Sequence, residues 1–221
     1  MNAAVFIDVQ NDFVTGALGS PWAQEVAPKI VEFAQNCRNR GFAMYATADT
    51  HEETELEGGK PVDGYLTTLE GRKLPVEHCL IGTNGHEIVN GLVKDGKGDV
   101  VIPQCNIFDK MTFGSDELLD KMAADFNDPI LDEGYGDLGE PLDAIYICGF
   151  VTNICVVSNV LALRREFPNV KIILVENLCA GAGKDAEDAK KNHEAAIRIA
   201  KSCQIDIGTW KAGSLVVEGG N

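Results

Sequence analysis

Short apolar segments alternate with segments of helical periodicity along most of the chain, and this alternation constrains the fold more than any other feature. The apolar segments are continuously hydrophobic, which is typical of strands that are covered on both faces of a sheet. Because helices separate the strands, we expect a parallel sheet with right-handed crossovers. The predicted fold is α/β: a three-layer, doubly wound, mainly parallel six-stranded sheet with helices on both faces. The strands are expected at residues 3–7, 42–48, 100–102, 144–148, 170–175 and 204–207.

Capping residues mark where the predicted helices begin. Ser20 followed by Pro21 is typical of a helix start, and Gly41 is expected to end that helix. Ser115 is expected to cap a helix that runs to residue 125. Further helices are expected at residues 87–93, 156–167 and 185–202.

Composition predicts one globular domain over residues 1–221, with 45% hydrophobic residues to build its core. The net charge of −15 argues against nucleic acid or an anionic membrane as a partner. The seven cysteines are dispersed without a CxxC pair, which indicates reduced thiols. The chain opens directly into a strand without a signal peptide, so we expect a cytoplasmic protein.

The segment Gly149–Cys155 joins the fourth expected strand to the helix that follows it. Thr152 and Asn153 are good N-cap residues, so Cys155 is expected in the first helical turn. Free backbone N–H groups and the helix dipole stabilise an anion there, which lowers the pKa of a thiol and favours a nucleophilic thiolate. The alternative is that Cys155 is a small buried hydrophobic residue, as most cysteines are.

Two further reactive side chains are expected near Cys155. In a sheet of strand order 3-2-1-4-5-6, strands 1 and 4 are neighbours at the point where ligands bind. Asp8 ends the first expected strand, and Lys110 follows the third. An aspartate can accept the thiol proton, and a lysine can hold the thiolate and polarise a carbonyl oxygen. The alternatives are a loop-capping carboxylate for Asp8 and a solvated surface side chain for Lys110.

The segment 50–85 lacks regular periodicity, and long loops inside a compact domain are usually functional. Asp49, His51 and His78 offer carboxylate and imidazole ligands that suit Zn²⁺, Fe²⁺ or Mn²⁺. Glu70 could add a fourth ligand. The other two histidines, His86 and His193, are expected to be ordinary helix residues.

Three motifs in this order resemble the isochorismatase-like cysteine hydrolases, over residues 3–207. They are Phe6–Phe13 (FIDVQNDF), the loop around Lys110, and Gly149–Val156 (GFVTNICV). Two further segments, Asp49–His51 and His78–Thr83, resemble the metal-binding part of nicotinamidases, which convert nicotinamide to nicotinate and ammonia.

The resemblance implies a catalytic triad of Asp8, Lys110 and Cys155, in which Asp8 deprotonates the thiol. Attack on the amide carbonyl would release ammonia, and water would then hydrolyse the thioester. The backbone N–H groups of Thr152 and Cys155 would form the oxyanion hole, beside a cis peptide bond between Val151 and Thr152.

The resemblance also implies roles for the remaining site residues. The divalent metal, most simply zinc, would be held by Asp49, His51 and His78 and would bind the pyridine nitrogen of the substrate. Glu70 matches a fourth ligand that some members have. Phe13 matches a pocket residue.

One segment departs from the nicotinamidase pattern. Many nicotinamidases have Trp-Pro-x-His-Cys, where the tryptophan packs on the substrate ring, whereas this chain has Leu74–Cys79 (LPVEHC). True isochorismatases act on a vinyl ether without a cysteine nucleophile, so Cys155 argues against that activity.

Three functions therefore remain open. The first is a metal-dependent, nicotinamidase-like amidohydrolase, and the second is a related hydrolase that acts on another small amide or ureido compound. The third is a non-catalytic protein that binds small molecules. By analogy with the family we expect a homo-oligomer. The exact amide, the metal, the number of subunits and the role of the acidic segment 127–140 are not determined by the sequence.

Overall fold

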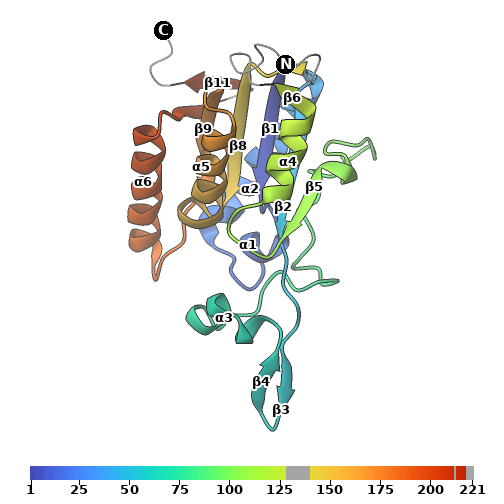
Figure 1. Ribbon diagram of the computed structural model, residues 1–221, viewed down its shortest axis with the longest axis vertical. Coiled ribbons are helices and arrows are strands. Elements are labelled where there is room, and N and C mark those ends of the chain that lie inside the picture. Colours follow the sequence, from blue (N-terminus) through green and yellow to red (C-terminus); the bar gives the residue numbers. More distant parts are fainter. Residues whose placement is uncertain (128–139, 212, 218–221) are drawn as a thin grey trace.

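A seven-stranded sheet forms the centre of the protein, in a computed structural model that describes residues 1–127, 140–211 and 213–217. The strand order is β11-β10-β9-β8-β1-β2-β5, and only the β10–β11 pair is antiparallel (Figure 1). The strands are β1 (Asn2–Ile7), β2 (Ala43–Asp49), β5 (Ile107–Lys110), β8 (Ala144–Phe150), β9 (Lys171–Ala180), β10 (Asp206–Lys211) and β11 (Ser214–Val217).

The predicted strand order is confirmed, and two details of the sheet are corrected. The sheet has seven strands rather than six, because the antiparallel strand β11 extends its edge beyond β10. The third strand is β5 and not residues 100–102, where Val101 and Ile102 are buried without forming a strand. A short apolar run indicates burial but does not distinguish a strand from a packed turn. Strand β5 was missed because it ends in the polar pair Asp109-Lys110.

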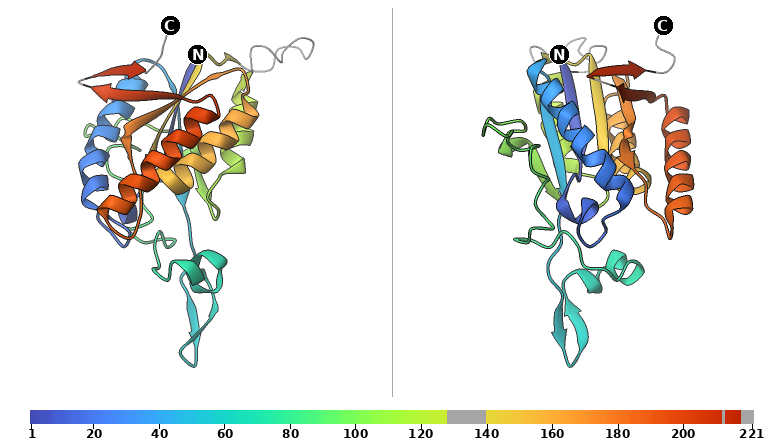
Figure 2. Two further views of the ribbon diagram at one scale, coloured as in Figure 1. Left: turned by 90° about the vertical axis from the view of Figure 1, so that its left-hand side faces the viewer. Right: turned by 180° about the vertical axis from the view of Figure 1, so that it is seen from behind.

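Helices cover both faces of the sheet, as predicted. Helix α2 (Pro21–Asn39) packs on one face, while α4 (Asp116–Asp125), α5 (Val157–Glu166) and α6 (Ala186–Ser202) lie together on the other (Figures 1 and 2). The two expected caps form, since the side chains of Ser20 and Ser115 each accept a hydrogen bond from a backbone N–H in the first turn. Asp185 caps α6 in the same way.

Residues 87–93 do not form the predicted helix. They are turns that pair with the segment after β1, through a bridge between Ile88 and Gln10. Gly91 adopts φ +95°, and a Cβ there would lie 2.8 Å from Val31 Cγ1 of α2. The positive φ ends any helical run at this residue.

The segment 50–85 contains short regular elements and extends away from the sheet as an arm. It holds a hairpin of β3 (Glu55–Glu57) and β4 (Lys60–Asp63), a 3-10 turn at Tyr65–Thr67, and the short helix α3 (Leu69–Lys73) (Figure 1). These elements are too short and too exposed to produce a periodic apolar pattern.

The remaining short elements are helix α1, a 3-10 turn, a π-helical turn and two paired two-residue strands. They are Asn11–Val14, Gln104–Asn106, Thr152–Val156, and β6 (Phe126–Asn127) with β7 (Glu140–Pro141). Most of the acidic segment 127–140, which the sequence predicts to be a surface excursion, lies outside the described residues. Within the described residues, no helix is long and apolar enough to span a membrane.

Candidate active site

Asp8, Lys110 and Cys155 meet at the carboxyl edge of the sheet. Asp8 follows β1, Lys110 ends β5, and Cys155 lies in the turn after β8. The Nζ atom of Lys110 lies 2.8 Å from Asp8 Oδ2 and donates a hydrogen bond of 3.4 Å to Cys155 Sγ. All three residues are buried, with relative exposures of 0%, 4% and 5%. The structure therefore brings the three predicted residues together, and the solvated alternative for Lys110 does not hold.

Lys110 also contacts Asp49, which sequence reasoning had assigned only to the metal group. Strand β2 lies between β1 and β5, so its last residue, Asp49, sits between Asp8 and Lys110. Lys110 Nζ donates to Asp49 Oδ1 at 3.0 Å. The strand order could have indicated this contact, because the carboxyl ends of three adjacent parallel strands meet at one edge.

The backbone and hydroxyl partners of Asp8 hold its carboxylate in place. Asp8 has φ +48°, an uncommon conformation for a residue with a Cβ that is often found at functional sites. Thr47 Oγ1 donates a hydrogen bond of 2.7 Å to Asp8 Oδ1. Burial raises the pKa of Asp8, while the charge of Lys110 acts in the opposite direction. A raised pKa suits a carboxylate that must accept a proton.

The pKa of Cys155 is raised, contrary to the expectation from its place near a helix start. Burial is the largest cause, the neighbouring Asp8 charge raises the pKa further, and Lys110 lowers it. Desolvation of the thiolate thus outweighs the helix dipole. The resting site holds a protonated thiol next to a carboxylate that can accept its proton.

The turn that carries Cys155 is a π-helical turn at Thr152–Val156, and the predicted N-caps are wrong. The side chain of Thr152 lies 2.9 Å from His193 Nδ1 of α6. The side-chain oxygen of Asn153 accepts a hydrogen bond from the N–H of Ala182. Both polar side chains therefore anchor the turn to α6 and its preceding loop instead of capping α5.

The cis peptide bond lies between Phe150 and Val151, one residue before the predicted Val151–Thr152 bond. Strand β8 continues through Phe150, which pairs with Ala180 of β9, so the chain leaves the sheet only after Phe150. Gly149 has φ +131°, and a Cβ there would lie 2.0 Å from the Ile7 carbonyl oxygen. Only glycine fits this approach of β8 to β1.

Asp49, His51 and His78 form a buried cluster next to Lys110. Their ligand atoms all lie within 4.8 Å of one another. Asp49 Oδ2 is 3.0 Å from His51 Nε2 and 3.3 Å from His78 Nε2. Burial alone would raise the pKa of Asp49, but the two histidine hydrogen bonds and the Lys110 charge lower it overall. The carboxylate is therefore ionised and available as a ligand.

Surrounding groups orient the cluster. Gln10 is fully buried, and its side-chain amide bonds both the N–H and the carbonyl of Asp49 at 2.8 Å. His78 Nδ1 lies 2.8 Å from the carbonyl oxygen of Val76, which leaves Nε2 directed at Asp49. The His51 N–H donates to Cys79 O at 3.1 Å and so joins the two ends of the arm.

The donor set fits a divalent metal ion. Zinc binds imidazole nitrogen and carboxylate oxygen at about 2.1 Å, so two ligand atoms of a tetrahedral site lie about 3.4 Å apart. The two Asp49–histidine separations are close to this value. Glu70 Oε1 lies 3.9 Å from His78 Nε2, near enough to complete the set. Burial raises the pKa of Glu70, and the nearby Asp49 charge adds to this effect.

A cavity of about 930 Å³ gives access to the site. It is lined by Cys155, Asp49 and His78 and, as predicted for a pocket residue, by Phe13. The ring of Phe13 lies 5.8 Å from that of His78. Leu74 also lines the cavity, near the position where many nicotinamidases have a tryptophan.

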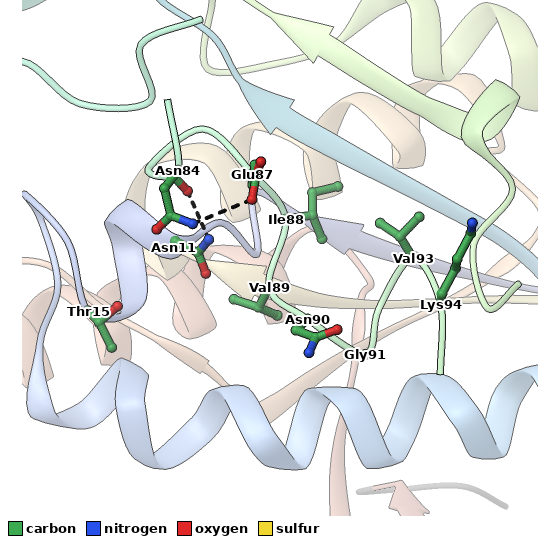
Figure 3. A pocket seen from close by; sticks show the side chains of 10 residues that line it. All are labelled: Asn11, Thr15, Asn84, Glu87, Ile88, Val89, Asn90, Gly91, Val93 and Lys94. Atoms are coloured by element: carbon green, nitrogen blue, oxygen red, sulfur yellow. Dashed lines mark hydrogen bonds between the residues drawn. The ribbon is translucent and has the colours of Figure 1, made fainter. Parts of the chain in front are cut away.

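A second, smaller hollow of about 460 Å³ lies between the segment after β1 and residues 84–94 (Figure 3). The Asn11 side chain donates to the carbonyl of Asn84, and Asn84 donates to Glu87 at 3.4 Å. These bonds tie the two segments together. The lining of this hollow does not include the acid, the lysine or the thiol of the site.

Sequence reasoning missed several residues that support the site. Thr47 and Gln10 could have been suspected from their places beside strand ends. His86 is not in a helix, and its Nε2 lies 2.9 Å from Thr50 Oγ1. The contact of His193 with Thr152 has no local sequence signal, because the two residues are far apart in the chain.

The fold and the site together define a class of protein. It is an α/β domain that holds a buried acid, amine and thiol beside a carboxylate–imidazole cluster at the carboxyl edge of a parallel sheet. The sequence matches the isochorismatase domain model over residues 2–211, so the chain belongs to the isochorismatase family. The family and fold expected from the sequence motifs are thereby confirmed.

Solved structures of the same fold include enzymes with known substrates. The zinc complex of Pyrococcus horikoshii pyrazinamidase is 22% identical, with a TM-score of 0.64 over 95% of this chain and 99% of that chain. Bacillus subtilis nicotinamidase/pyrazinamidase is 20% identical, with a TM-score of 0.63 over 93% and 98%. N-carbamoylsarcosine amidase from Thermoplasma acidophilum is 19% identical, with a TM-score of 0.62 over 99% of both chains. At identities of 19–22%, these comparisons show a similarity of fold and not of activity. Comparison with curated proteins finds no significant match.

Proposed function

We propose that the protein is a metal-dependent cysteine amidohydrolase of the nicotinamidase type, which converts nicotinamide to nicotinate and ammonia through a thioester. The observation that carries the proposal is the position of Lys110 Nζ, within 3.4 Å of a buried acid, a buried thiol and a candidate metal ligand. Such a group serves acyl transfer, because it combines a nucleophile, a base and a fixed positive charge.

In the proposed reaction, Asp8 accepts the proton of Cys155 as Sγ attacks the amide carbonyl carbon. A carbon–sulfur bond forms, and the carbonyl oxygen becomes an oxyanion that the backbone N–H groups of Thr152 and Cys155 would stabilise. Asp8 then gives the proton to the leaving nitrogen, the carbon–nitrogen bond breaks, and ammonia departs. Water attacks the thioester while Asp8 accepts its proton, and the acid leaves as the thiol is restored.

Lys110 stabilises the negative charge that these proton transfers leave inside a buried site. Its ammonium is adjacent to Asp8 and Cys155 and compensates whichever of them carries the negative charge. Its own pKa is raised despite burial, because the negative charges of Asp8 and Asp49, and that of Cys155 when it is a thiolate, stabilise the ammonium. Lys110 therefore stays protonated throughout and acts as a fixed cation.

Asp49, His51 and His78 would hold the metal, with Glu70 as a fourth ligand. Zinc suits this donor set, as do Fe²⁺ and Mn²⁺. When bound, the ion supplies a Lewis acid that can accept a lone pair from the substrate and orient it. Phe13 packs against His78 and limits how a substrate ring can lie beside the cluster.

A second candidate is hydrolysis of another small amide or a ureido compound by the same residues. The observation that favours it is Leu74, which lines the cavity where many nicotinamidases present a tryptophan to the substrate ring. The N-carbamoylsarcosine amidase of the same fold illustrates such a substrate.

Ammonia release tests both candidates. Zinc-loaded wild-type protein and Cys155→Ala are assayed with nicotinamide, pyrazinamide and N-carbamoylsarcosine at millimolar concentration. We expect turnover of nicotinamide by the wild type and none by Cys155→Ala. Turnover of only another compound would favour the second candidate. Binding without turnover of any amide would instead support the non-catalytic alternative.

The proposal also covers the assembly, the location and the partners of the enzyme. We propose a single domain that assembles into a homo-oligomer in the cytoplasm and takes small-molecule amides, with neither nucleic acid nor a membrane as partner. The net charge of −15 supports the last point, because it repels polyanions and anionic lipid surfaces. Size-exclusion chromatography with light scattering tests the assembly.

A further inference from the structure

The cavity at the candidate site extends beyond the residues that the proposed reaction uses. One continuous space of about 930 Å³ is lined by Cys155 and His78 and also by Trp22 and the loop before α6. Pockets of about 300–1,000 Å³ enclose drug-sized ligands. One aromatic ring with a carboxamide would fill only a small part of this space. The rest can hold a further group of the substrate.

The outer part of the cavity has apolar walls with small side chains. Leu18 comes from the segment that leads into α2, Trp22 comes from the first turn of α2, and Gly181 and Ala182 come from the loop between β9 and α6. A Cβ at Gly181 would lie 2.5 Å from Ala189 O, so this loop packs closely on α6. The loop therefore lines the cavity with backbone atoms and the methyl group of Ala182, next to the indole ring of Trp22.

The carboxylates of Glu25 and Asp185 beside this part of the cavity have partners within the protein. Glu25 forms an ion pair with Lys29 at 2.8 Å, and Asp185 accepts a hydrogen bond from the N–H of Asp188. The backbone N–H of Lys184 donates a hydrogen bond of 3.0 Å to Asp188 Oδ2. An apolar group of a ligand would disturb none of these contacts.

Trp22 is held in position by groups outside the cavity. Its ring lies 5.0 Å from the ring of His193, and His193 in turn lies 2.9 Å from Thr152 Oγ1 in the turn that carries Cys155. An aromatic surface that is fixed before binding captures apolar groups at a low cost in conformational entropy.

We infer that the substrate is a primary amide or ureido compound whose acyl part carries an additional aromatic or similarly apolar group, and that this group binds against Trp22 beside Gly181 and Ala182. The inference rests on the proposed amidohydrolase function and specifies its substrate class. Many nicotinamidases have a tryptophan near the position of Leu74. In this protein Trp22 offers an aromatic surface elsewhere in the same cavity.

Relative specificity tests the inference. Wild-type kcat/KM is measured for nicotinamide, for its 5-phenyl and 6-phenyl derivatives, and for 3-phenylpropanamide. Burial of a phenyl group predicts that the best phenyl amide exceeds nicotinamide by about tenfold or more. Trp22→Ala should lower this ratio about tenfold, whereas Trp22→Phe should preserve most of it.

Two further variants keep the result interpretable. Ala186→Leu narrows the same cavity from the start of α6 and should also lower the ratio, without removing any packing. Leu56→Ala removes an exposed apolar side chain of the arm and should leave the ratio unchanged. A wild-type ratio below one for every phenyl amide, or a ratio that Trp22→Ala and Ala186→Leu do not change, would overturn the inference.

Binding separates this inference from the proposed reaction. If no compound releases ammonia, the proposed function fails, and calorimetry with Cys155→Ala still measures the affinity for the same four compounds. The inferred subsite predicts that the best phenyl amide binds at least about tenfold more tightly than nicotinamide. Equal affinities would reject the subsite independently of catalysis.

Discussion

At the scale of single residues, Lys110 connects the acid, the thiol and the candidate metal ligand. Its ammonium forms ion pairs with two buried carboxylates, Asp8 and Asp49, and also contacts the thiol of Cys155. An unpaired buried carboxylate strongly destabilises the folded state. Lys110 therefore supports the stability of the protein as well as the proposed chemistry.

Lys110→Met should therefore reduce both stability and activity. Breaking a buried ion pair typically costs about 3–5 kcal/mol of the free energy of unfolding. Urea denaturation measures this loss, and ammonia release from the preferred amide should fall at least about a hundredfold. Lys191→Met removes an exposed i,i+4 pair with Glu187 and should change stability by less than about 0.5 kcal/mol. Similar effects of the two substitutions would contradict the central role of Lys110.

His193 predicts a pH dependence of stability. Burial lowers the pKa of His193 in the folded protein, and the charge of Glu194 only partly opposes this. The unfolded chain, with an ordinary histidine pKa of about 6.5, binds the proton first as the pH falls. Stability contributed by neutral His193 is thus present above about pH 6.5 and is lost as the pH falls through the folded pKa.

His193→Asn provides the measurement, because an amide can still bond the hydroxyl of Thr152. Between pH 7.5 and pH 5, the free energy of unfolding should fall less steeply in the variant than in the wild type. Parallel pH profiles for the two proteins would show that His193 titrates in the same way in the folded and unfolded states.

At the scale of elements, the close approach of β8 to β1 places the thiol beside the acid. In these neighbouring parallel strands, Gly149 pairs with Ile7, which is the residue before Asp8. The position admits no side chain, because a Cβ would overlap the Ile7 carbonyl oxygen.

Gly149→Ala should consequently destabilise the protein severely. The new methyl group must displace β1 or β8, and the φ of +131° is unfavourable for alanine, so we expect a loss of at least about 3 kcal/mol. Gly96→Ala is the matched control, because nothing lies within 4 Å of its Cβ and its φ is not positive. Thermal denaturation of both variants distinguishes the positions, and an equal effect would refute the steric argument.

Helices and strands could be predicted from the sequence where the local residue pattern matches the role of the segment in the folded protein. Continuous apolar runs located β1, β2 and β8, and side-chain caps located the starts of α2 and α4. The prediction failed at β5, whose four residues end in the charged pair Asp109-Lys110. It also failed at Thr152 and Asn153, because these side chains bond α6 and the loop before it rather than the adjacent helix.

At the scale of the whole molecule, the site lies where the arm joins the sheet. Asp49 ends β2, His51 opens the arm, and His78 lies where the arm returns. A metal bound by these residues would connect both ends of the arm to the sheet. Metal binding should then stabilise the arm as well as the site.

Addition of zinc is expected to raise the melting temperature of metal-free protein and to slow proteolysis within residues 52–77. At a zinc concentration about 100 times the Kd, binding to the folded state contributes about 2.7 kcal/mol. His51→Ala and His78→Ala should abolish both effects, whereas His86→Gln should retain them. Retention of the thermal shift in the ligand variants would show that zinc binds elsewhere.

From the sequence alone, apolar runs predicted the parallel α/β fold, and the resemblance of three motifs indicated the family and the residues expected at the site. The tertiary structure decided how those residues act. It placed Asp49 against Lys110, raised the pKa of Cys155 through burial, set the cis bond at Phe150–Val151 and brought Trp22 into the cavity of Cys155. Each of these depends on contacts between distant segments and on the exclusion of water, which no local pattern encodes.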